Sequence, residues 1–497
     1  MASILFLSRS ILNLSSRPQH ATAERAFTSD DQLAFAKLSG DHNPVHVNPV
    51  MARRLLFGQQ IVHGMHAVLW SVDECLRTRT QGLELRAVKA NFQAGIGIGQ
   101  AVNCICIDQN EHQIEIRLEI EKASAMWIQI ALSPSRQHPA ETLQTAPCAP
   151  GKCRERSFEE AAGASGSLPL YLDRELAATL FPNLMRLVPP MQLAALLATT
   201  RLVGMECPGL HSIYAGLNLA FFPDPTGVPE VSYHVADGNH RLALLTMDVE
   251  APGMRGQIKT FFRPTPQAQA AFADLCRQVK SDEFSEQRAL IIGGSRGLGE
   301  VAAKLLAAGG AEVIITYYRG EQDAKRIAEE IAVHGAKAEC LPLNVLDPSP
   351  ALSSMVANPS MPLYLYYFAT PFIFGAVKGR FSAKRFTTFS DYYVTGFLRT
   401  VQTLTASAAG LQKIFYPSST AIEELPLDMG EYAAAKMAGE VLCDFLQKIP
   451  PGIAIHKPRL PRVATDQTVS LLPVSNQDPV SVLLAHLRYL RQLAPHA

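Results

Sequence analysis

Residues 288–320 restrict the fold more than any other part of the chain. An apolar segment, Leu290–Ile292, leads into a glycine-rich loop, and an apolar helical pattern, Val301–Ala308, follows before a second β-branched segment. The loop glycines are Gly293, Gly297 and Gly299. Glycines between a strand and a helix allow a tight turn and let a pyrophosphate approach the helix N-terminus. The run predicts a doubly wound α/β domain with a nucleotide site.

A second constellation lies closer to the C-terminus. Tyr432 and Lys436 are one helical turn apart on one face, and Ser419 precedes them after an apolar strand at Lys413–Tyr416. A nearby cation lowers the pKa of a phenol, which helps the phenol to move a proton. With the glycine loop, this pattern resembles the short-chain dehydrogenase/reductase family, within a domain over residues 286–497. The resemblance implies that Tyr432 is the general acid in reduction, that Lys436 assists it and grips the ribose, and that Ser419 holds the substrate carbonyl.

The cofactor type follows from charge. The second strand ends in Thr316-Tyr317-Tyr318-Arg319, which offers no acid for a ribose 2′-hydroxyl, whereas Arg319 and Arg296 could bind a 2′-phosphate. We therefore favour NADP(H); the alternative is that both arginines are solvated surface residues. The resemblance implies a cofactor site made by Gly293, Ser295, Arg296, Gly297, Leu298, Gly299, Arg319, Asn344, Val345, Ala369, Tyr432 and Lys436.

The chain departs from this family at several positions. Ile292 stands for the usual threonine, and Asn344 for the usual aspartate. Tyr393 stands for the helix asparagine that supports a relay water, and Arg459 for the glycine of a Pro-Gly pair. These changes leave the serine, tyrosine and lysine but alter their surroundings, so the substrate and the rate of hydride transfer stay open.

The stretch from Leu38 to Met65 carries a different chemistry. Asp41, Asn43 and His46 surround Pro44, which excludes a helix interior and predicts a turn that gathers polar groups. A carboxylate and an imidazole so placed suit proton transfer. A salt bridge within the loop is the alternative. His42 and His46 have a metal-pair spacing, but Pro44 breaks the helix that such a pair needs, so we expect no metal site.

A helical pattern opens further along the same stretch, at Gly64. A backbone N–H at a helix start can stabilise a developing thioester enolate oxygen. The segments SGDHNPVH and FGQQIVHGM resemble the MaoC-like, (R)-specific enoyl-CoA hydratase family of the hot-dog fold. The resemblance implies that Asp41 and His46 are the acid/base pair, that Asn43 orients the pair or the substrate, and that the Gly64 N–H forms the oxyanion hole.

The rest of the N-terminal half fits α+β hot-dog architecture. Residues 112–122 alternate apolar and charged side chains, as expected for an antiparallel strand with one wet face. We expect one hot-dog domain over residues 24–133, a Pro-rich linker over 134–166 and a second, diverged hot-dog domain over 167–265 that lacks the catalytic motif. Residues 264–286 are predicted to form a helical connector. Cys207, His211 and Ser212 in CPGLHS could supply a nucleophile, but a structural turn is favoured.

Composition narrows the class of protein. Lys+Arg and Asp+Glu both number 45, so no basic surface for nucleic acid is expected, and no segment resembles a membrane span. The nine cysteines form no C-x-x-C pair, which suits a reduced compartment. Residues 1–23 resemble a mitochondrial transit peptide in part, but a disordered extension is favoured, and with it a cytoplasmic location.

Together the two resemblances imply successive reactions on one acyl thioester. We expect a bifunctional 3-oxoacyl-thioester reductase and (R)-3-hydroxyacyl-thioester dehydratase that acts in fatty-acid, polyketide or related biosynthesis. The carrier could be CoA or acyl carrier protein, and both families commonly form homo-oligomers. One alternative is a hydratase whose reductase domain is only a cofactor-binding or structural module. Another alternative is the oxidative direction, in which an enoyl-CoA is hydrated and the product is then oxidised, but NADP(H) as the cofactor favours reduction.

Overall fold

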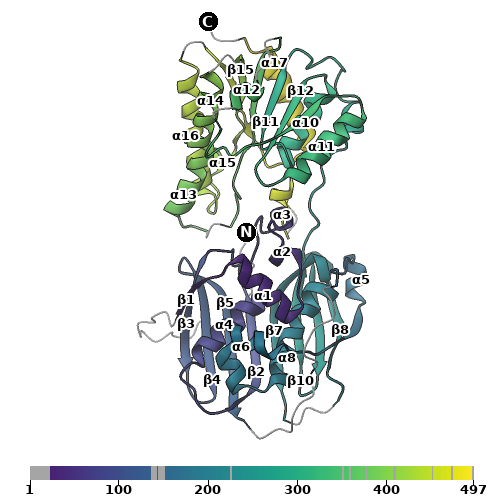
Figure 1. The fold of residues 1–497 in the computed structure, drawn as a ribbon, viewed down its shortest axis with the longest axis vertical. Coiled ribbons are helices and arrows are strands. Elements are labelled where there is room, and N and C mark those ends of the chain that lie inside the picture. The colour runs from purple at the N-terminus through teal and green to yellow at the C-terminus, as the bar shows by residue number, and fades with distance from the viewer. Residues whose placement is uncertain are drawn as a thin grey trace. The chain divides into compact units, whose positions relative to one another are not determined.

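The computed structural model describes residues 23–494 apart from 136–142, 144–150, 224–226, 350–351, 357–359, 376–377, 407–409, 450–451 and 472–473. The chain divides into two compact units, one ending at Thr265 and the other starting at Pro266, and each is described by itself (Figure 1). None of the helices in the described part combines the length and apolar character that a bilayer span needs.

A ten-stranded antiparallel sheet forms the first unit, in the order β1-β3-β4-β5-β2-β7-β10-β9-β8-β6. Its strands are β1 (Ala23–Ala26), β2 (Leu83–Phe92), β3 (Ala101–Gln109), β4 (Gln113–Ile120), β5 (Ala123–Pro134), β6 (Ser165–Pro169), β7 (Ser212–Phe221), β8 (Glu230–Asn239), β9 (Leu244–Ala251) and β10 (Met254–Phe262). The first five strands in the sequence form one half and the last five the other. The halves join where β2 pairs with β7, with Ala87 opposite Ala220.

Each half contributes one long buried helix, α4 or α8 (Figure 1). The helical elements of this unit are α1 (Ser29–Ser39), α2 (Pro44–Val47), α3 (Pro49–Ala52), α4 (Gly64–Cys75), α5 (Phe158–Ala162), α6 (Arg174–Leu180), α7 (Pro182–Leu187), α8 (Pro190–Arg201), the π-helical turn η1 (Leu202–Glu206) and the 3₁₀ turns η2 (Gly209–His211) and η3 (His240–Leu242). Leu69 of α4, Leu196 of α8 and Leu219 of β7 belong to one apolar core that both halves share. Burial of this core couples the halves.

The strand expected over residues 112–122 is present as β4, and its apolar side chains alternate with polar ones as the sequence predicts. Part of the stretch interpreted as a linker is regular structure, because α5 and the start of β6 lie within residues 134–166. Residues 1–22 of the expected extension lie outside the described residues, whereas Ala23 already belongs to β1.

A six-stranded parallel sheet organises the second unit, in the doubly wound order β13-β12-β11-β14-β15-β17. Its strands are β11 (Arg288–Ile292), β12 (Glu312–Tyr317), β13 (Ala338–Pro342), β14 (Leu363–Tyr367), β15 (Leu411–Phe415) and β17 (Ala454–His456), and the short β16 (Ser418–Ser419) pairs with β18 (Arg459–Leu460). The α/β prediction for this region agrees with this sheet.

Helices cover both faces of the parallel sheet. The first face packs against α10 (Gly297–Ala308), α11 (Glu321–Val333) and α17 (Pro479–Gln492), and the second against α12 (Leu352–Val356), α14 (Phe397–Thr405) and α16 (Gly430–Leu446). The remaining helical elements are α9 (Phe272–Leu275), α13 (Ala383–Ser390), the π-helical turn η4 (Asp391–Gly396), α15 (Ala421–Glu424) and the 3₁₀ turn η5 (Asp466–Thr468).

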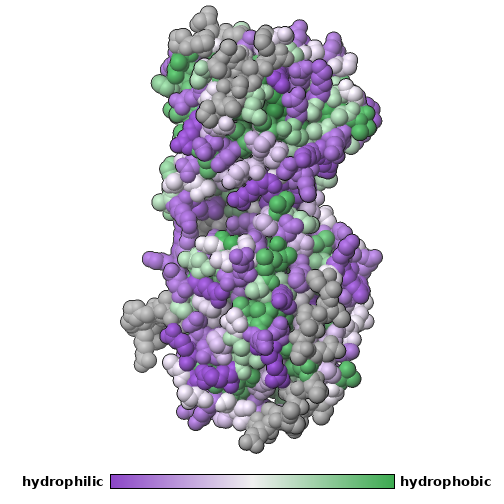
Figure 2. Space-filling model, in the orientation of Figure 1, coloured by the Kyte–Doolittle hydropathy of each residue, from purple (hydrophilic) through white to green (hydrophobic). Residues whose placement is uncertain are grey.

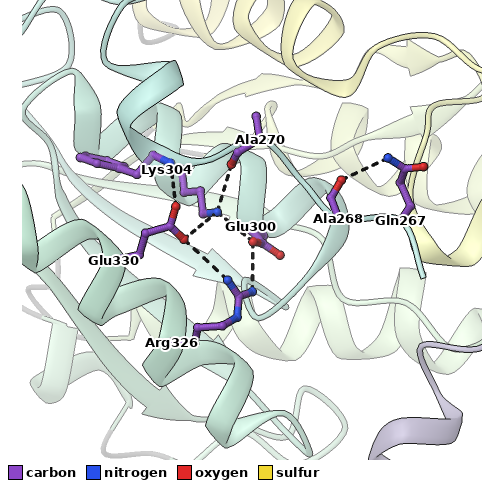
Figure 3. Close-up of polar contacts among 8 residues, drawn as sticks. Gln267, Ala268, Ala270, Glu300, Lys304, Arg326 and Glu330 are labelled. Atoms are coloured by element: carbon purple, nitrogen blue, oxygen red, sulfur yellow. Dashed lines mark hydrogen bonds and ion pairs between the residues drawn. The ribbon is translucent and has the colours of Figure 1, made fainter. Parts of the chain in front are cut away.

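The prediction of a helical connector over residues 264–286 is wrong, because α9 is its only helix. Polar contacts with helices α10 and α11 of the same unit hold the segment instead (Figure 3). The buried Lys304 ammonium donates to the Ala270 carbonyl at 3.1 Å and pairs with Glu300 at 3.0 Å and Glu330 at 2.9 Å. Glu330 also accepts from the Phe272 N–H at 2.7 Å. Because the Ala270 carbonyl and the Phe272 N–H find hydrogen-bond partners in side chains, the segment does not have to form a helix to satisfy them.

Candidate functional site

The turn that carries Asp41 begins where α1 ends. Gly40 adopts φ +77°, a left-handed conformation that commonly ends helices, and a Cβ there would lie 1.9 Å from the Tyr171 hydroxyl. Asn43 then caps α2 by accepting from the Val45 N–H at 3.2 Å, and Pro44 takes the first helical position, where its missing N–H costs nothing. The predicted turn is therefore a cap followed by one short helix.

Asp41 is a buried carboxylate with two hydrogen bonds. Its side-chain oxygens accept from the Thr200 hydroxyl at 2.7 Å and from the Asn43 N–H at 3.1 Å. Burial raises the pKa of Asp41, and the nearby His46 and the two hydrogen bonds oppose that shift.

His46 lies close to this carboxyl group. Its Nδ1 is 3.0 Å from the Ile61 carbonyl, which can only accept, so we assign the proton to Nδ1 and leave Nε2 as the basic nitrogen. Burial lowers the pKa of His46 to about 3, which keeps the imidazole neutral. One polar atom each of Asp41, His46 and His63 lie within 4.8 Å of one another. The structure therefore brings together the two residues that the sequence pairs.

The N-terminus of α4 lies next to this pair. Gly64 is its first residue, so its N–H has no partner inside the helix. The preceding His63 stacks on His46 with ring centroids 3.9 Å apart and places Nε2 2.9 Å from the Asp41 carbonyl. A Cβ on Gly64 would lie 2.8 Å from the Phe92 ring, so any larger residue would have to displace that ring. The first turn of α4 therefore lies beside the Asp41/His46 pair.

Asn43 connects the turn to the second half of the unit. Its Nδ2 donates to the Gly204 carbonyl at 3.0 Å and the Gly209 carbonyl at 3.1 Å. Gly204 lies in η1, directly against the carboxylate, because a Cβ there would lie 2.1 Å from Asp41 Oδ1. The amide of Asn43 is thus occupied with backbone contacts, which suit a bracing role.

Asp41, His46 and His63 have a spacing that could hold a metal ion. However, both ring nitrogens of His63 already face oxygens, Gln32 Oε1 and the Asp41 carbonyl, each at 2.9 Å. His46 Nδ1 is engaged as well. Burial lowers the pKa of His63 to about 3, so its neutral ring donates from one nitrogen only. A metal ion would still have to displace the contacts of both imidazoles, so the arrangement suits proton transfer better.

Sequence reasoning missed the residues that hold Asp41 from the second half. Thr200 is the penultimate residue of the apolar helix α8, and Gly204 follows in η1 without a turn signal. Neither belongs to a motif, and only the packing of α8 and η1 against α1 and α2 brings them to the carboxylate. A π-helical turn is often found at functional sites, but it cannot be recognised in the sequence.

The glycine loop of the second unit has the conformation that a dinucleotide site needs. Gly293 adopts φ +76°, and its N–H donates to the Thr316 hydroxyl at 3.0 Å. A Cβ on Gly299 would lie 2.3 Å from the Gly293 carbonyl, and one on Gly293 would lie 3.0 Å from the Ala369 nitrogen. The loop therefore packs against Ala369 and leads into α10, whose first N–H groups have no partner within the helix, which fits a pyrophosphate.

The other expected cofactor residues have varied surroundings. Arg296 forms an ion pair with Asp466 at 2.8 Å, whereas Arg319 is exposed and stacks near the Tyr318 ring. Asn344 caps its own turn by accepting from the Leu346 N–H at 3.1 Å, and Val345 is buried. Arg319 is thus the more accessible of the two predicted phosphate ligands.

The serine, tyrosine and lysine lie together beyond β15. The expectation that the nearby cation lowers the pKa of Tyr432 is wrong: burial raises this pKa to about 12, and only a hydrogen bond with the Ser419 side chain opposes the shift. The Lys436 ammonium donates to the Pro417 carbonyl at 2.7 Å and lies 6.0 Å from the Tyr432 ring centroid. Burial lowers the pKa of Lys436 to about 7. These three groups can hold a carbonyl and supply a proton.

Two of the departures from the dehydrogenase pattern have partners of their own. The Tyr393 ring lies 4.0 Å from the Lys436 ammonium, and the Tyr393 carbonyl accepts from the Tyr416 hydroxyl at 2.9 Å. Arg459 pairs with Glu440 at 2.8 Å, and Glu440 also accepts from Ser418. A cation–π contact therefore stands where the family pattern leads us to expect a relay water.

Two family models match this sequence. Residues 12–118 match the MaoC like domain, and residues 287–449 match the short chain dehydrogenase. The chain joins a MaoC-like domain to a short-chain dehydrogenase domain. The geometry of the Asp41 turn thus belongs to the first domain, and that of Tyr432 to the second.

Individual relatives match parts of each domain. The 3-hydroxybutyryl-CoA dehydratase of Methylorubrum extorquens is 32% identical over 81 residues, which is 16% of this chain and 51% of that protein. Peroxisomal multifunctional enzyme type 2 of Drosophila melanogaster is 36% identical over 77 residues, 15% of this chain and 13% of that protein. An NADPH-dependent aldehyde reductase-like protein, chloroplastic, of Arabidopsis thaliana is 28% identical over 189 residues, 34% of this chain and 68% of that protein. The chain thus spans about half the length of the first relative and a smaller share of the second.

Gly204→Ala should inactivate the MaoC-like domain. The new methyl group would overlap the Asp41 carboxylate and displace it, and a displacement of about 1 Å can cost about 100-fold in rate. The measurement is the hydration rate of crotonyl-CoA. Gly163→Ala is the control, because its Cβ would meet only the Glu159 carbonyl, at 3.9 Å. Equal rates for both variants would refute the close packing at Gly204.

Thr200→Val should move the acid limb of the hydration pH profile to higher pH. The hydroxyl stabilises the ionised form of Asp41, so its loss raises the pKa of Asp41 further. A hydrogen bond to a charged group contributes about 1.5–3 kcal/mol, which corresponds to a shift of roughly one to two pH units. Thr199→Val is the matched control, since that hydroxyl donates to the Leu196 carbonyl of its own helix. An unchanged acid limb in Thr200→Val would contradict the assignment.

Proposed function

We propose that the MaoC-like domain is an (R)-3-hydroxyacyl-thioester dehydratase, which also hydrates the enoyl thioester. The observation that carries this proposal is a buried carboxylate, Asp41, next to a neutral imidazole, His46, at the tip of a helix. The named dehydratase relative acts on 3-hydroxybutyryl-CoA, and an acyl thioester is therefore the substrate class that we infer here.

The proposed mechanism uses the chain's own polar groups. The thioester carbonyl accepts from the Gly64 N–H, and the positive end of the α4 dipole stabilises the enolate oxygen. The Asp41/His46 pair removes the proton from C2 and returns a proton to the departing C3 hydroxyl, so that water leaves and a C2–C3 double bond forms. Asn43 and Thr200 hold the carboxylate in place during both transfers.

We infer that the second domain is an NADPH-dependent 3-oxoacyl-thioester reductase. Bound nicotinamide would supply the hydride. Ser419 would hold the 3-oxo group, Tyr432 would protonate it, and Lys436 would assist the phenol and bind the ribose. The glycine loop fits the pyrophosphate, and Arg319 fits a 2′-phosphate. The name of the Arabidopsis relative, which is NADPH-dependent, supports the same choice of cofactor.

The two activities form a sequence on one acyl chain. Reduction of a 3-oxoacyl thioester gives the 3-hydroxyacyl thioester, and its dehydration gives the trans-2-enoyl thioester. We therefore propose a role in fatty-acid, polyketide or related acyl-chain assembly, with CoA or acyl carrier protein as the carrier.

We propose a domain arrangement that matches these two activities. The second half of the ten-stranded sheet, from about residue 167 to 265, would be a diverged hot-dog domain that lacks the catalytic turn and holds the acyl chain. The dehydrogenase domain would occupy residues 286–497.

Helix α16 exposes Met437, Val441 and Phe445 at four-residue spacing, a stripe that a second copy of the chain could cover. We infer a homo-oligomer on this basis.

A specific observation favours a second candidate, a dehydratase whose reductase domain only binds the cofactor. The rings of Tyr393 and Tyr416 lie 4.0 Å and 5.1 Å from the Lys436 ammonium, and Arg296 is paired with Asp466. Binding of NADPH without oxidation by any 3-oxoacyl thioester would support this second candidate.

Single substitutions should separate the two activities. Asp41→Asn or His46→Ala removes the acid/base pair, so hydration of crotonyl-CoA should fall by at least about 100-fold while NADPH oxidation by acetoacetyl-CoA continues. Tyr432→Phe removes the proton donor and should do the converse. Product analysis by mass spectrometry after incubation with NADPH and a series of 3-oxoacyl thioesters measures both steps. Loss of both activities in each variant would mean that the sites are not independent.

The rate of reduction should fall as pH rises through about 7. Burial lowers the pKa of Lys436 to about 7, so its ammonium form is present below that pH and is lost above it, and with it the assistance to Tyr432. The measurement is the initial rate of NADPH oxidation across this range at saturating cofactor. Hydration by the other domain of the same chain monitors the integrity of the protein. A rate that stays constant through this range would show that Lys436 keeps its proton.

A further inference from the structure

Arg263 is the largest fully buried side chain of the first unit. It follows β10, in the second half of the sheet. Its backbone N–H donates to the His211 carbonyl at 2.6 Å, and its Nη2 donates to the Leu210 carbonyl. Among the described residues, Nε and Nη1 have no hydrogen-bond partner, and no carboxylate forms an ion pair with this guanidinium. Two of its three donor nitrogens are therefore available.

The guanidinium lies beside the catalytic turn. The Leu210 carbonyl that accepts from Arg263 also accepts from Asn43 Nδ2 at 3.4 Å. Its positive charge acts on His46, where it helps to lower the pKa after the larger effects of burial and of His63. It also acts on Cys153, whose pKa is raised first by burial and then by Asp41. Arg263 is thus within electrostatic reach of the groups that carry out the proposed reaction.

A buried cation without a counter-ion is costly. Burial lowers the pKa of Arg263 to about 10, so the side chain remains charged at neutral pH. Isolated charges in protein interiors are normally paired. Elsewhere in this half, Arg154 and Arg156 both pair with Glu206, at 2.8 Å and 3.2 Å, whereas Arg201 lies over the Tyr171 ring. The missing anion at Arg263 is therefore best supplied by a ligand.

We propose that Arg263 binds an anionic oxygen of the bound acyl group in the dehydratase site. This inference rests on the proposed dehydratase function. Two sources of that oxygen share the same chemistry. One is the thioester oxygen, which gains negative charge when C2 loses its proton. The other is a carboxylate carried by the acyl chain itself. In both cases a guanidinium with two free donors can form charge-assisted hydrogen bonds.

The test compares two substrates with the full-length protein: crotonyl-CoA, and an enoyl-CoA whose acyl chain ends in a carboxylate, such as glutaconyl-CoA. Arg263→Gln removes the charge. If the oxygen is the thioester enolate, kcat should fall by about 100-fold for both substrates with little change in KM. If it is a substrate carboxylate, KM should rise for glutaconyl-CoA alone. Arg255→Gln is the matched control, because Arg255 is exposed on the preceding strand β10.

Further measurements keep the outcome decisive. NADPH oxidation and thermal melting report whether each variant is folded. If Arg263→Gln does not fold, Arg263→Lys retains a cation with fewer and differently placed donors, and a fall in kcat or kcat/KM of about tenfold or more would support the proposal. Rates within twofold of wild type for both substrates, in a folded Gln or Lys variant, would overturn it. Absence of hydration by the wild-type protein would instead refute the dehydratase function itself.

Discussion

The burial of one carboxylate governs the architecture of the first unit. Asp41 lies at the end of α1, but its two oxygens receive hydrogen bonds from the Asn43 backbone and from Thr200 of α8. A buried carboxylate without donors would either take up a proton or destabilise the fold. The second half of the sheet, which carries no catalytic motif, is therefore needed to complete the environment of the motif in the first half.

The same dependence explains the local backbone around the turn. Helix α8 continues into the π-helical turn η1, and Gly204 within that turn leaves space for the Asp41 carboxylate. The carbonyls of Gly204, Gly209 and Leu210 accept from the Asn43 amide. Backbone from one half thus grips a side chain from the other, and the continuous β2–β7 pairing keeps the two halves in register.

Burial has a different consequence in the dehydrogenase domain. The Lys436 ammonium donates to one backbone carbonyl and lies over an aromatic ring, and neither carries the full negative charge of a carboxylate. Burial therefore lowers its pKa to about 7. The substitutions that depart from the family pattern are not isolated, since Tyr393 covers Lys436 and Arg459 binds Glu440. The residues around the proposed proton donor have been rearranged as a group, which makes the chemistry of this domain the most informative quantity to measure.

The sequence by itself determined the local elements. Alternation in β4, the glycines before α10 and the helical spacing of Tyr432 and Lys436 each express a period or a backbone requirement that a few neighbouring residues satisfy. Asp41, His46 and Gly64 were likewise recognisable, because all three lie within the single stretch from Leu38 to Met65. Residues 264–286 were misjudged as helix because contacts of Ala270 and Phe272 with Lys304 and Glu330 decide that segment. Only the tertiary structure brings Thr200, Gly204 and Arg263 near Asp41 and His46. They lie more than a hundred residues away in the chain and approach the turn through the packing of helix and sheet rather than through any local pattern.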